Sequence, residues 1–266
     1  MKATVFLGGG RITSALVAGL RLAGYKHPIV VHDRHSKKLQ DLERQYRVIV
    51  KEDLAGAVKL ANLLVVAVRP ESVCELLKEI GELEFRRRLT TVSLAAGIPL
   101  SRLQARLGLP VRWARAMPSP VCRSGRGLTG LTFGRGLSAS ERTAVRNLFT
   151  SVGAVVEIPE KQFDAFTVTY SSSHGYHALA VLARAAEAVG LDHKTALLGA
   201  AHALADGIAT WRSGNLSLEQ LLKEAATPGG IAEATMAALD RAGFGRIVQH
   251  GLCSGITRAS KNASLL

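Results

Sequence analysis

Cysteine and aromatic residues are scarce in this 266-residue sequence. The three cysteines, Cys74, Cys122 and Cys253, show neither CxxC nor Cys/His spacing. An odd number without such spacing offers no disulfide framework and no zinc site, so we expect a reducing, cytoplasmic setting and no metal. Aromatic residues make up only 5% of the chain. With no recognisable binding module beside them, this low content argues against nucleic acid as a partner.

Long apolar runs are also missing. A membrane-spanning helix needs about 18 or more consecutive apolar residues, and no such run occurs, so we expect no membrane association. The apolar run at 4–7 is too short for the apolar region of a signal peptide and ends in glycines. With 47% hydrophobic and 21% charged residues, the composition predicts a folded protein with an ample core.

Positive charge is concentrated in the first part of the chain. Residues 1–160 hold 25 basic and 13 acidic residues, whereas residues 161–266 hold 9 and 8. The formal net charge of +13 therefore lies almost wholly before residue 161. A positive field of this kind fits a solvated basic surface, an anionic cofactor or nucleic acid, and the last of these is disfavoured by the low aromatic content.

Residues 1–160 alternate between strand and helix patterns. Strands are predicted at 4–7, 28–33, 62–68, 89–95, 111–116, 127–134 and 154–159, and helices at 12–24, 37–46, 71–81, 98–108 and 138–152. Such alternation predicts βαβ units and a parallel sheet. The strands are apolar on both faces, as expected where helices cover both sides. The fold class is therefore α/β, with an N-terminal Rossmann-type doubly wound sheet.

The remaining residues predict helices only, at 174–189, 195–211, 217–225, 231–242 and 244–262. The first two are apolar nearly all round, and such helices must be buried on every face. A domain of roughly 105 residues has too little interior to enclose both. We therefore predict a dinucleotide-binding domain at 1–160 and an all-helical dimerisation and substrate domain at 161–266, covered by a second subunit in a homodimer.

A glycine triplet, Gly8-Gly9-Gly10, lies between the first predicted strand and helix. In a GxGxxG-type turn the first glycine permits the tight bend, and the second lets the backbone approach a diphosphate at the helix N-terminus. Thr13 stands at the third position, normally Gly or Ala. Inside a βαβ unit this pattern predicts dinucleotide binding. The expected cofactor contacts here are Gly8, Gly10, Arg11 and Ile12.

The end of the second predicted strand bears on which nicotinamide cofactor binds. Asp33 suits the ribose hydroxyls of NADH. The cationic or hydroxyl side chains that follow suit the 2′-phosphate of NADPH, and these are Arg34, Ser36 and Lys37. Three such donors and the positive field favour NADPH, with NADH possible. A solvated helix start is the plainer interpretation of Ser36 and Lys37. Further along, Val68 ends the strand predicted at 62–68, and Arg69 and Pro70 follow it at the edge where the nicotinamide nucleotide would lie.

Taken together, several segments resemble the pyrroline-5-carboxylate reductase family over nearly the whole chain. They are FLGGGRITSAL at the glycine turn, AVRPE at 67–71, VSLAAGI at 92–98, RAMPSP at 115–120, VGAVVEIPE at 152–160 and TPGG at 227–230. The resemblance implies NAD(P)H-dependent reduction of a cyclic imine carboxylate to an amino acid such as proline. It also implies interlocked dimers, possible assembly into a larger ring, and cofactor contacts from Ala95, Met117 and Pro118. Arg115 is interpreted either as a core ion-pair residue or as a neighbour of the cofactor.

The sequence differs from the family pattern where that family meets its substrate. A Ser-Gly-Ser-Gly-Pro-Ala-Tyr-like run is replaced by YSSSHGY at 170–176, in which Ser172 and Tyr176 match. A Pro-Gly-Gly-Thr-Thr run becomes PGGIA at 228–232, so Gly229 and Gly230 remain while Ile231 replaces a threonine. Ser119 stands in place of an asparagine. The fold and the cofactor therefore transfer more readily than the identity of the imine.

The segment YSSSHGYH at 170–177 supports two interpretations. Serines 171 to 173 are good helix N-cap residues, so a helix start alone would account for them. Alternatively, Ser172 and Ser173 bind the substrate carboxylate, with Gly229, Gly230 and Ile231 as further substrate contacts. His174 or Tyr176 would then donate a proton to the imine or orient it. The candidate catalytic residues are therefore Ser172, His174 and Tyr176.

Two alternative functions remain at this stage. A β-hydroxyacid dehydrogenase-like enzyme would share both domains, but such enzymes use a lysine on the first long helix of the second domain, and residues 174–189 contain none. A non-catalytic NADPH-binding sensor or partner protein is suggested by the missing threonine hydroxyls. Imine reduction itself needs few catalytic side chains, because hydride transfer depends mainly on proximity and orientation.

Overall fold

The computed structural model describes residues 3–83 and 87–266, which form two compact units. The first comprises residues up to Tyr170 together with Ser254–Leu266, and the second is Ser171–Cys253. The first unit contains one eight-stranded sheet in the order β3-β2-β1-β4-β5-β6-β7-β8. Its strands are β1 (Ala3–Leu7), β2 (Ile29–His32), β3 (Ile49–Val50), β4 (Ala61–Val66), β5 (Leu89–Ser93), β6 (Val111–Met117), β7 (Gly127–Phe133) and β8 (Gly153–Glu157).

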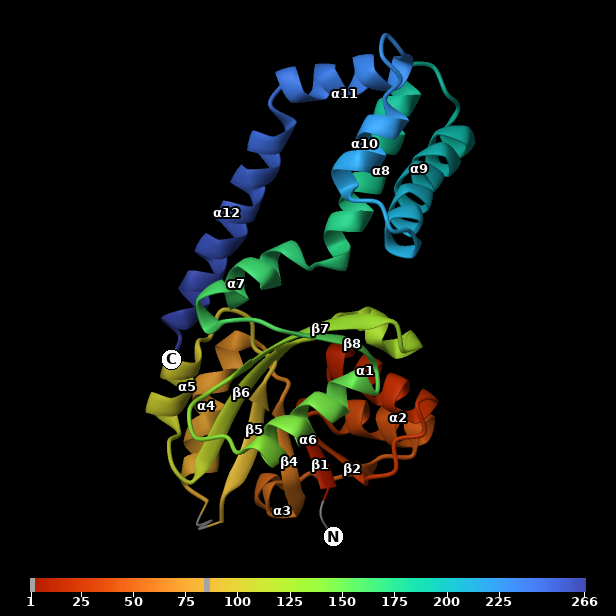
Figure 1. The fold of residues 1–266 in the computed structure, drawn as a ribbon. Helices are drawn as coiled ribbons and strands as arrows, with labels where there is room; N and C mark the ends of the chain where they lie inside the picture. Colours follow the sequence, from red (N-terminus) through yellow and green to blue (C-terminus); the bar gives the residue numbers. More distant parts are fainter. Residues whose placement is uncertain (1–2, 84–86) are drawn as a thin grey trace. The chain divides into compact units, whose positions relative to one another are not determined.

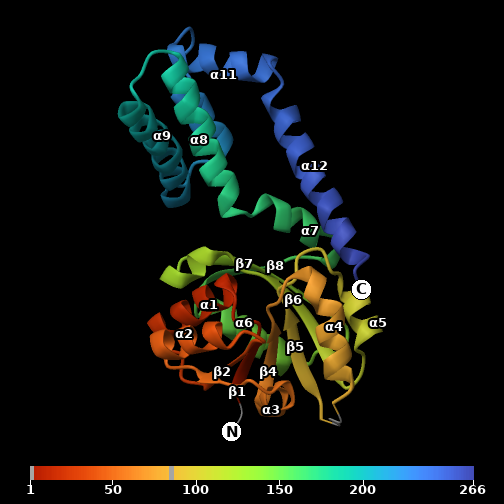
Figure 2. The ribbon, with the colours of Figure 1, turned by 180° about the vertical axis from the view of Figure 1, so that it is seen from behind.

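Helices cover both faces of this sheet, as Figures 1 and 2 show from opposite sides. One apolar cluster joins the sheet to α1 (Arg11–Leu22), α2 (Ser36–Tyr46) and α6 (Ala139–Thr150). The other joins it to α3 (Leu54–Leu60), α4 (Pro70–Gly81) and α5 (Leu100–Arg106). The central strands are buried throughout, which explains why their sequences are apolar on both faces. The predicted α/β fold class with a Rossmann-type domain is confirmed.

The sheet departs from the predicted parallel arrangement in its last two strands, β7 and β8. β1 to β6 run parallel, but β7 pairs antiparallel with β6, and β8 then pairs parallel with β7. The link between β6 and β7 holds only a short 3₁₀ helix, η1 (Pro120–Ser124). Such a link is too short for a parallel crossover, which needs a dozen or more residues. The short elements β3, α3 and η1, and the helix α7 (Glu160–Thr169), were not predicted.

The strand order reverses beside β1, because β2 lies on one side of it and β4 on the other. In open α/β sheets, ligands bind outside the carboxyl ends of the strands at such a switch point. Here the amide of Gly8 donates to the His32 carbonyl at 2.7 Å, and that of Ala67 donates to the Leu7 carbonyl at 2.8 Å. The ends of β1, β2 and β4 are thereby joined, which fixes the candidate cofactor site.

The second unit consists of α8 (Ser172–Ala188), α9 (His193–Ser213), α10 (Leu218–Ala225), α11 (Ile231–Arg241) and the first part of α12 (Phe244–Ala263). Few of its side chains are buried within the chain, namely Ala183 in α8 and Ala196 and Ala200 in α9. Large apolar side chains remain exposed, among them Leu198 at 59% and Ile208 at 55%. Across the described residues, every helix falls short of the length and apolarity that crossing a membrane requires.

The two compact units divide the chain differently from the predicted domains at 1–160 and 161–266. Helix α7 and the last thirteen residues belong with the sheet. The physical reason lies in α7, where Phe163 is fully buried and two carboxylates bind Arg115 of β6. These contacts hold α7 to the first unit.

Candidate functional site

The glycine turn after β1 places different demands on its first and third residues. Gly8 has a φ of +109°, and a Cβ added there would lie 2.7 Å from the Ala67 carbonyl oxygen. Only glycine fits that backbone and that space. Gly10, the N-cap of α1, has a φ of −77°, and none of the atoms in the described part of the chain lies within 4 Å of its added Cβ. The fold itself therefore requires Gly8 but leaves the space beside Gly10 free for a ligand.

The N-terminus of α1 is suited to an anion. The N-cap of this helix is Gly10, which has no side chain to cap it. The amides of the first turn, including those of Arg11 and Ile12, have no partner within the helix. Such a terminus carries a partial positive charge and binds phosphate groups. Thr13 is fully buried and donates its hydroxyl hydrogen to the Gly8 carbonyl at 2.5 Å. The threonine thus stabilises the turn at the position where Gly or Ala is usual, and the residues present fit a dinucleotide diphosphate.

Asp33, just after β2, also supports the turn. Its carboxylate accepts the amide hydrogens of Gly9 at 2.8 Å and His35 at 2.9 Å. Lys38 lies 3.4 Å away on α2. Burial alone would raise the pKa of Asp33, but the hydrogen bonds from Gly9 and His35 and the nearby Lys38 together lower it. Asp33 is therefore an anion already committed to the protein, which leaves it less free to accept ribose hydroxyls and is consistent with the NADPH prediction.

The residues predicted to hold a 2′-phosphate have different surroundings. Arg34 is exposed and forms ion pairs with Glu75, at 3.0 Å, and Glu79 of α4. Ser36 begins α2, and both it and Lys37 are exposed. Lys38, which was not predicted from the sequence, is the cation placed against Asp33. Lys38 lies five residues after Asp33 at an exposed helix start, and nothing in that sequence pattern indicates that the two side chains meet.

The other predicted cofactor residues lie at the carboxyl ends of β4, β5 and β6. Val68 and Arg69 follow β4, where Arg69 is the N-cap of α4 and Pro70 its first residue. Ala95 is buried, and its amide donates to the Ser93 hydroxyl at 3.2 Å. Met117 ends β6, and Pro118, which follows it, is buried. Because parallel strands end at the same edge of a sheet, the fold brings these residues to the edge that carries the glycine turn.

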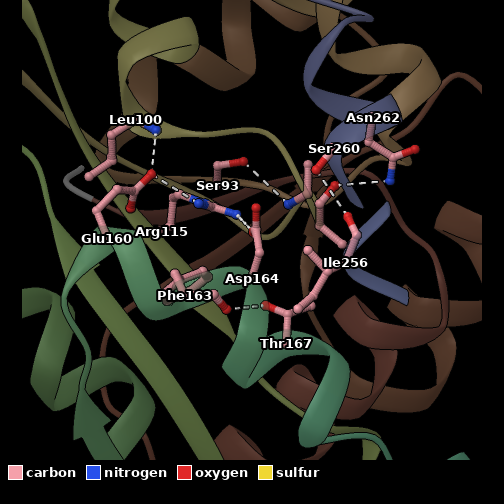
Figure 3. A network of polar contacts seen from close by, with 12 residues as sticks. Ser93, Leu100, Arg115, Glu160, Phe163, Asp164, Thr167, Ile256, Ser260 and Asn262 are labelled. Carbon is pink, nitrogen blue, oxygen red and sulfur yellow. Dashed lines mark hydrogen bonds and ion pairs between the residues drawn. The ribbon is translucent and has the colours of Figure 1, made fainter. Parts of the chain in front are cut away.

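Arg115 proves to be an ion-pair residue of the core. Only 1% of its side chain is exposed, and its guanidinium lies 2.9 Å from Glu160 and 2.8 Å from Asp164 of α7. It also lies over the ring of Phe163 at 4.4 Å. Figure 3 shows Arg115 between the two carboxylates. Glu160 in turn accepts the Leu100 amide hydrogen at 2.8 Å, so this cluster links β6, α7 and α5.

The predicted substrate residues lie in the second unit at the starts of two helices. Ser171 is the N-cap of α8 but makes no side-chain cap bond; its hydroxyl lies 2.6 Å from that of Ser173. The side chain of Ser171 therefore does not cap α8. Ser172 begins the helix, His174 lies in its first turn, and Tyr176 is 70% exposed.

The start of α11 carries the second group of predicted substrate residues. Gly229 has a φ of +74°, and its amide donates to Glu233 at 2.6 Å, while Gly230 is the helix N-cap. Ile231 is 89% exposed. Glu233 thus accepts one of the amide hydrogens at this turn, an arrangement that was not predicted from the sequence.

The segment η1 packs along α1 and carries the buried thiol of Cys122. Burial raises the pKa of Cys122 to about 11, so it is a packing residue rather than a nucleophile. Arg123 is exposed and donates to the Tyr46 hydroxyl at 3.2 Å and to the Ser14 hydroxyl at 3.4 Å.

Comparisons with known proteins agree with this arrangement. Residues 4–97 match the family model described as NADP oxidoreductase coenzyme F420-dependent, and residues 160–262 match that of pyrroline-5-carboxylate reductase dimerisation. Pyrroline-5-carboxylate reductase of Mycobacterium leprae is 31% identical over 93% of this chain and 92% of its own. That of Corynebacterium melassecola is 30% identical over 92% of each. The structure of a pyrroline-5-carboxylate reductase from Coxiella burnetii, 24% identical, covers 98% of both chains with a TM-score of 0.88, a likeness of fold. The chain therefore belongs to the pyrroline-5-carboxylate reductase family, as its sequence motifs indicated.

Proposed function

We infer that this protein is an NADPH-dependent oxidoreductase that reduces a cyclic imine carboxylate, pyrroline-5-carboxylate or a related imine. The observation that carries this inference is the free N-terminus of α1 beside Gly10, at the switch point of the sheet, in a chain of this family. NADH is the second cofactor to be compared.

The main role of the protein's residues is to bind and orient the cofactor and the substrate. When bound, NADPH supplies the hydride for the imine carbon. The amides of Gly10, Arg11 and Ile12 hold the diphosphate, and Arg69, Ala95 and Met117 border the nicotinamide. Ser172 and Ser173 bind the substrate carboxylate together with the Gly229–Ile231 turn. His174 or Tyr176 protonates or orients the imine nitrogen. Because a protonated imine is already electrophilic, alignment and exclusion of water account for most of the catalysis.

A panel of five- and six-membered cyclic imine carboxylates tests this function. NADPH oxidation is expected with at least one of them, and the comparison of their kcat/KM values identifies the preferred ring. NADPH binding without turnover on any member would favour the alternative of a non-catalytic sensor. That alternative draws support from one observation, which is that Ile231 exposes an apolar side chain where the family pattern has a threonine hydroxyl.

Replacement of Ser172 by alanine is expected to raise the KM for the imine about tenfold or more. A hydroxyl bound to a charged carboxylate contributes about 1.5–3 kcal/mol. The Kd for NADPH should stay within about twofold, because Ser172 lies on α8 and the diphosphate amides on α1. Steady-state kinetics and fluorescence titration measure the two constants. Equal changes in both, or no change in either, would contradict the role of Ser172 as a carboxylate ligand.

We also propose that the protein is a homodimer in which the second unit of one subunit covers that of the other. The exposed apolar side chains of α8 and α9 support this, since helices with so few buried residues are not stable alone in water. Sedimentation equilibrium should give a multiple of the 28.3 kDa chain mass. A mass of two chains would indicate a dimer, and a larger multiple would indicate a ring of dimers. A stable monomer at micromolar concentration would contradict the proposal.

A further inference from the structure

The last residues of the chain contact the loop after β5. Asn262 is 8% exposed, and its side-chain amide donates to the Ala96 carbonyl at 3.2 Å. Figure 3 shows Asn262 on α12, across from Ser93. The two partners lie 166 residues apart in sequence. Asn262 therefore contacts the segment that leaves the carboxyl end of β5, at the edge of the sheet where the cofactor is expected.

Backbone packing shows a second close approach between α12 and this loop. Gly97 has a φ of +77°, and a Cβ added there would lie 2.3 Å from the Ala259 carbonyl oxygen. Ala259 is 5% exposed, and Leu266 packs against the core cluster that includes Ile98. The loop and the last turn of α12 thus have complementary shapes, with glycine at the point where their backbones approach.

The same loop carries Ala95, whose amide is held by the Ser93 hydroxyl. Two hydrogen bonds therefore fix this short segment, one from its own strand and one from the C-terminal turn. The measured Kd of a ligand rises in proportion as the conformation that binds it becomes less populated. A loop that is held in that conformation therefore binds its ligand more tightly.

We propose that Asn262 is a positioning residue that holds the Ala95–Gly97 loop in the conformation that receives the nicotinamide. This rests on the proposed function, which places the cofactor against Ala95. Asn262 acts through the backbone of Ala96 and touches neither cofactor nor substrate. The C-terminal turn is then a functional part of the cofactor site.

The test compares Asn262→Ala with Ser264→Ala in the full chain. Ser264 lies two residues further on, is exposed, and donates its hydroxyl hydrogen to the Lys261 carbonyl at 2.7 Å. Asn262→Ala should raise the Kd for NADPH about fivefold, the ratio that corresponds to one hydrogen bond of average strength. Asn262→Asp should weaken binding further, since a carboxylate would face the Ala96 carbonyl. The KM for the imine should change by less than about twofold in either variant, and Ser264→Ala should match the original protein.

Fluorescence titration of NADPH, with circular dichroism to determine the folded fraction, separates positioning from stability. A variant with a lowered melting temperature but an unchanged Kd for its folded fraction would overturn the positioning role. So would equal Kd values for the Ala, Asp and Ser264 variants in a protein that reduces imines. If the original chain binds NADPH but reduces no imine while Asn262→Ala still weakens binding, the positioning role stands and the proposed activity fails. Absence of NADPH binding by the original chain would overturn both.

Discussion

Replacement of Gly10 by valine is expected to weaken NADPH binding about 100-fold or more with little effect on folding. The backbone of Gly10 is extended, with φ −77° and ψ −173°, and the space for a side chain is open in the protein itself. In the complex that space belongs to the diphosphate, and a branched side chain would separate the phosphate from the amides of α1. Loss of two hydrogen bonds to a charged group, each of about 1.5–3 kcal/mol, accounts for the size of the effect.

The matched comparison is Gly8→Val in the same turn. Gly8 has a positive φ and would place its Cβ against the Ala67 carbonyl, so this change should destabilise the fold itself. Gly10→Val, by contrast, should lower the melting temperature by no more than about 4 °C, since valine is a poorer N-cap than glycine. Calorimetric titration and thermal unfolding measure both variants. NADPH binding by Gly10→Val with the affinity of the original protein would contradict a diphosphate at this turn.

Replacement of Arg115 by methionine is expected to cause a large loss of stability. Methionine keeps much of the volume but leaves Glu160 and Asp164 without their cation. Removal of one partner from a buried ion pair costs about 3–5 kcal/mol. Because about one third of each carboxylate is exposed, water offsets part of this, and we expect about 2–4 kcal/mol. The melting temperature should fall by about 5–15 °C.

A combined variant separates charge from packing at this cluster. With Glu160→Gln and Asp164→Asn added to Arg115→Met, no unpaired charge remains in the cluster. The first of these changes keeps a side-chain oxygen that can accept the Leu100 amide hydrogen. Stability should recover by at least half of the loss. If the single and combined variants unfold at the same temperature, the loss is one of packing and the ion-pair account is wrong.

The sequence predicted much of the first unit because its signals are local. Strands buried on both faces and amphipathic helices have distinct periods, and the glycine turn stands between the first strand and helix. The direction of β7 was not predicted, since it depends on the length of a loop that contains an unexpected 3₁₀ helix. Helix α7 was missed because its stability comes from Phe163 and the partners of Arg115 rather than from its own pattern.

In the candidate site, too, the residues with local sequence signals were predicted and those with remote partners were not. Gly8 and Gly10 were identified from neighbouring residues, whereas Arg115 was left with two interpretations, because its carboxylate partners follow 45 and 49 positions later. Asn262 gave no signal, since a single asparagine near a helix end is common and its partner is remote in sequence. The surroundings of Ser172 and Tyr176 depend on what covers an exposed helix start, which the amino-acid pattern of one chain does not specify.

Transfer of isotope from the cofactor tests the central claim most directly. The protein is mixed with NADPH deuterated at the transferring position of the nicotinamide and with pyrroline-5-carboxylate or the best imine of the panel, and the product is analysed by mass spectrometry. The account predicts one deuterium on the carbon that formed the C=N bond, with the added proton on nitrogen. A protein that binds NADPH yet yields no deuterated amino acid from any of these imines would contradict it.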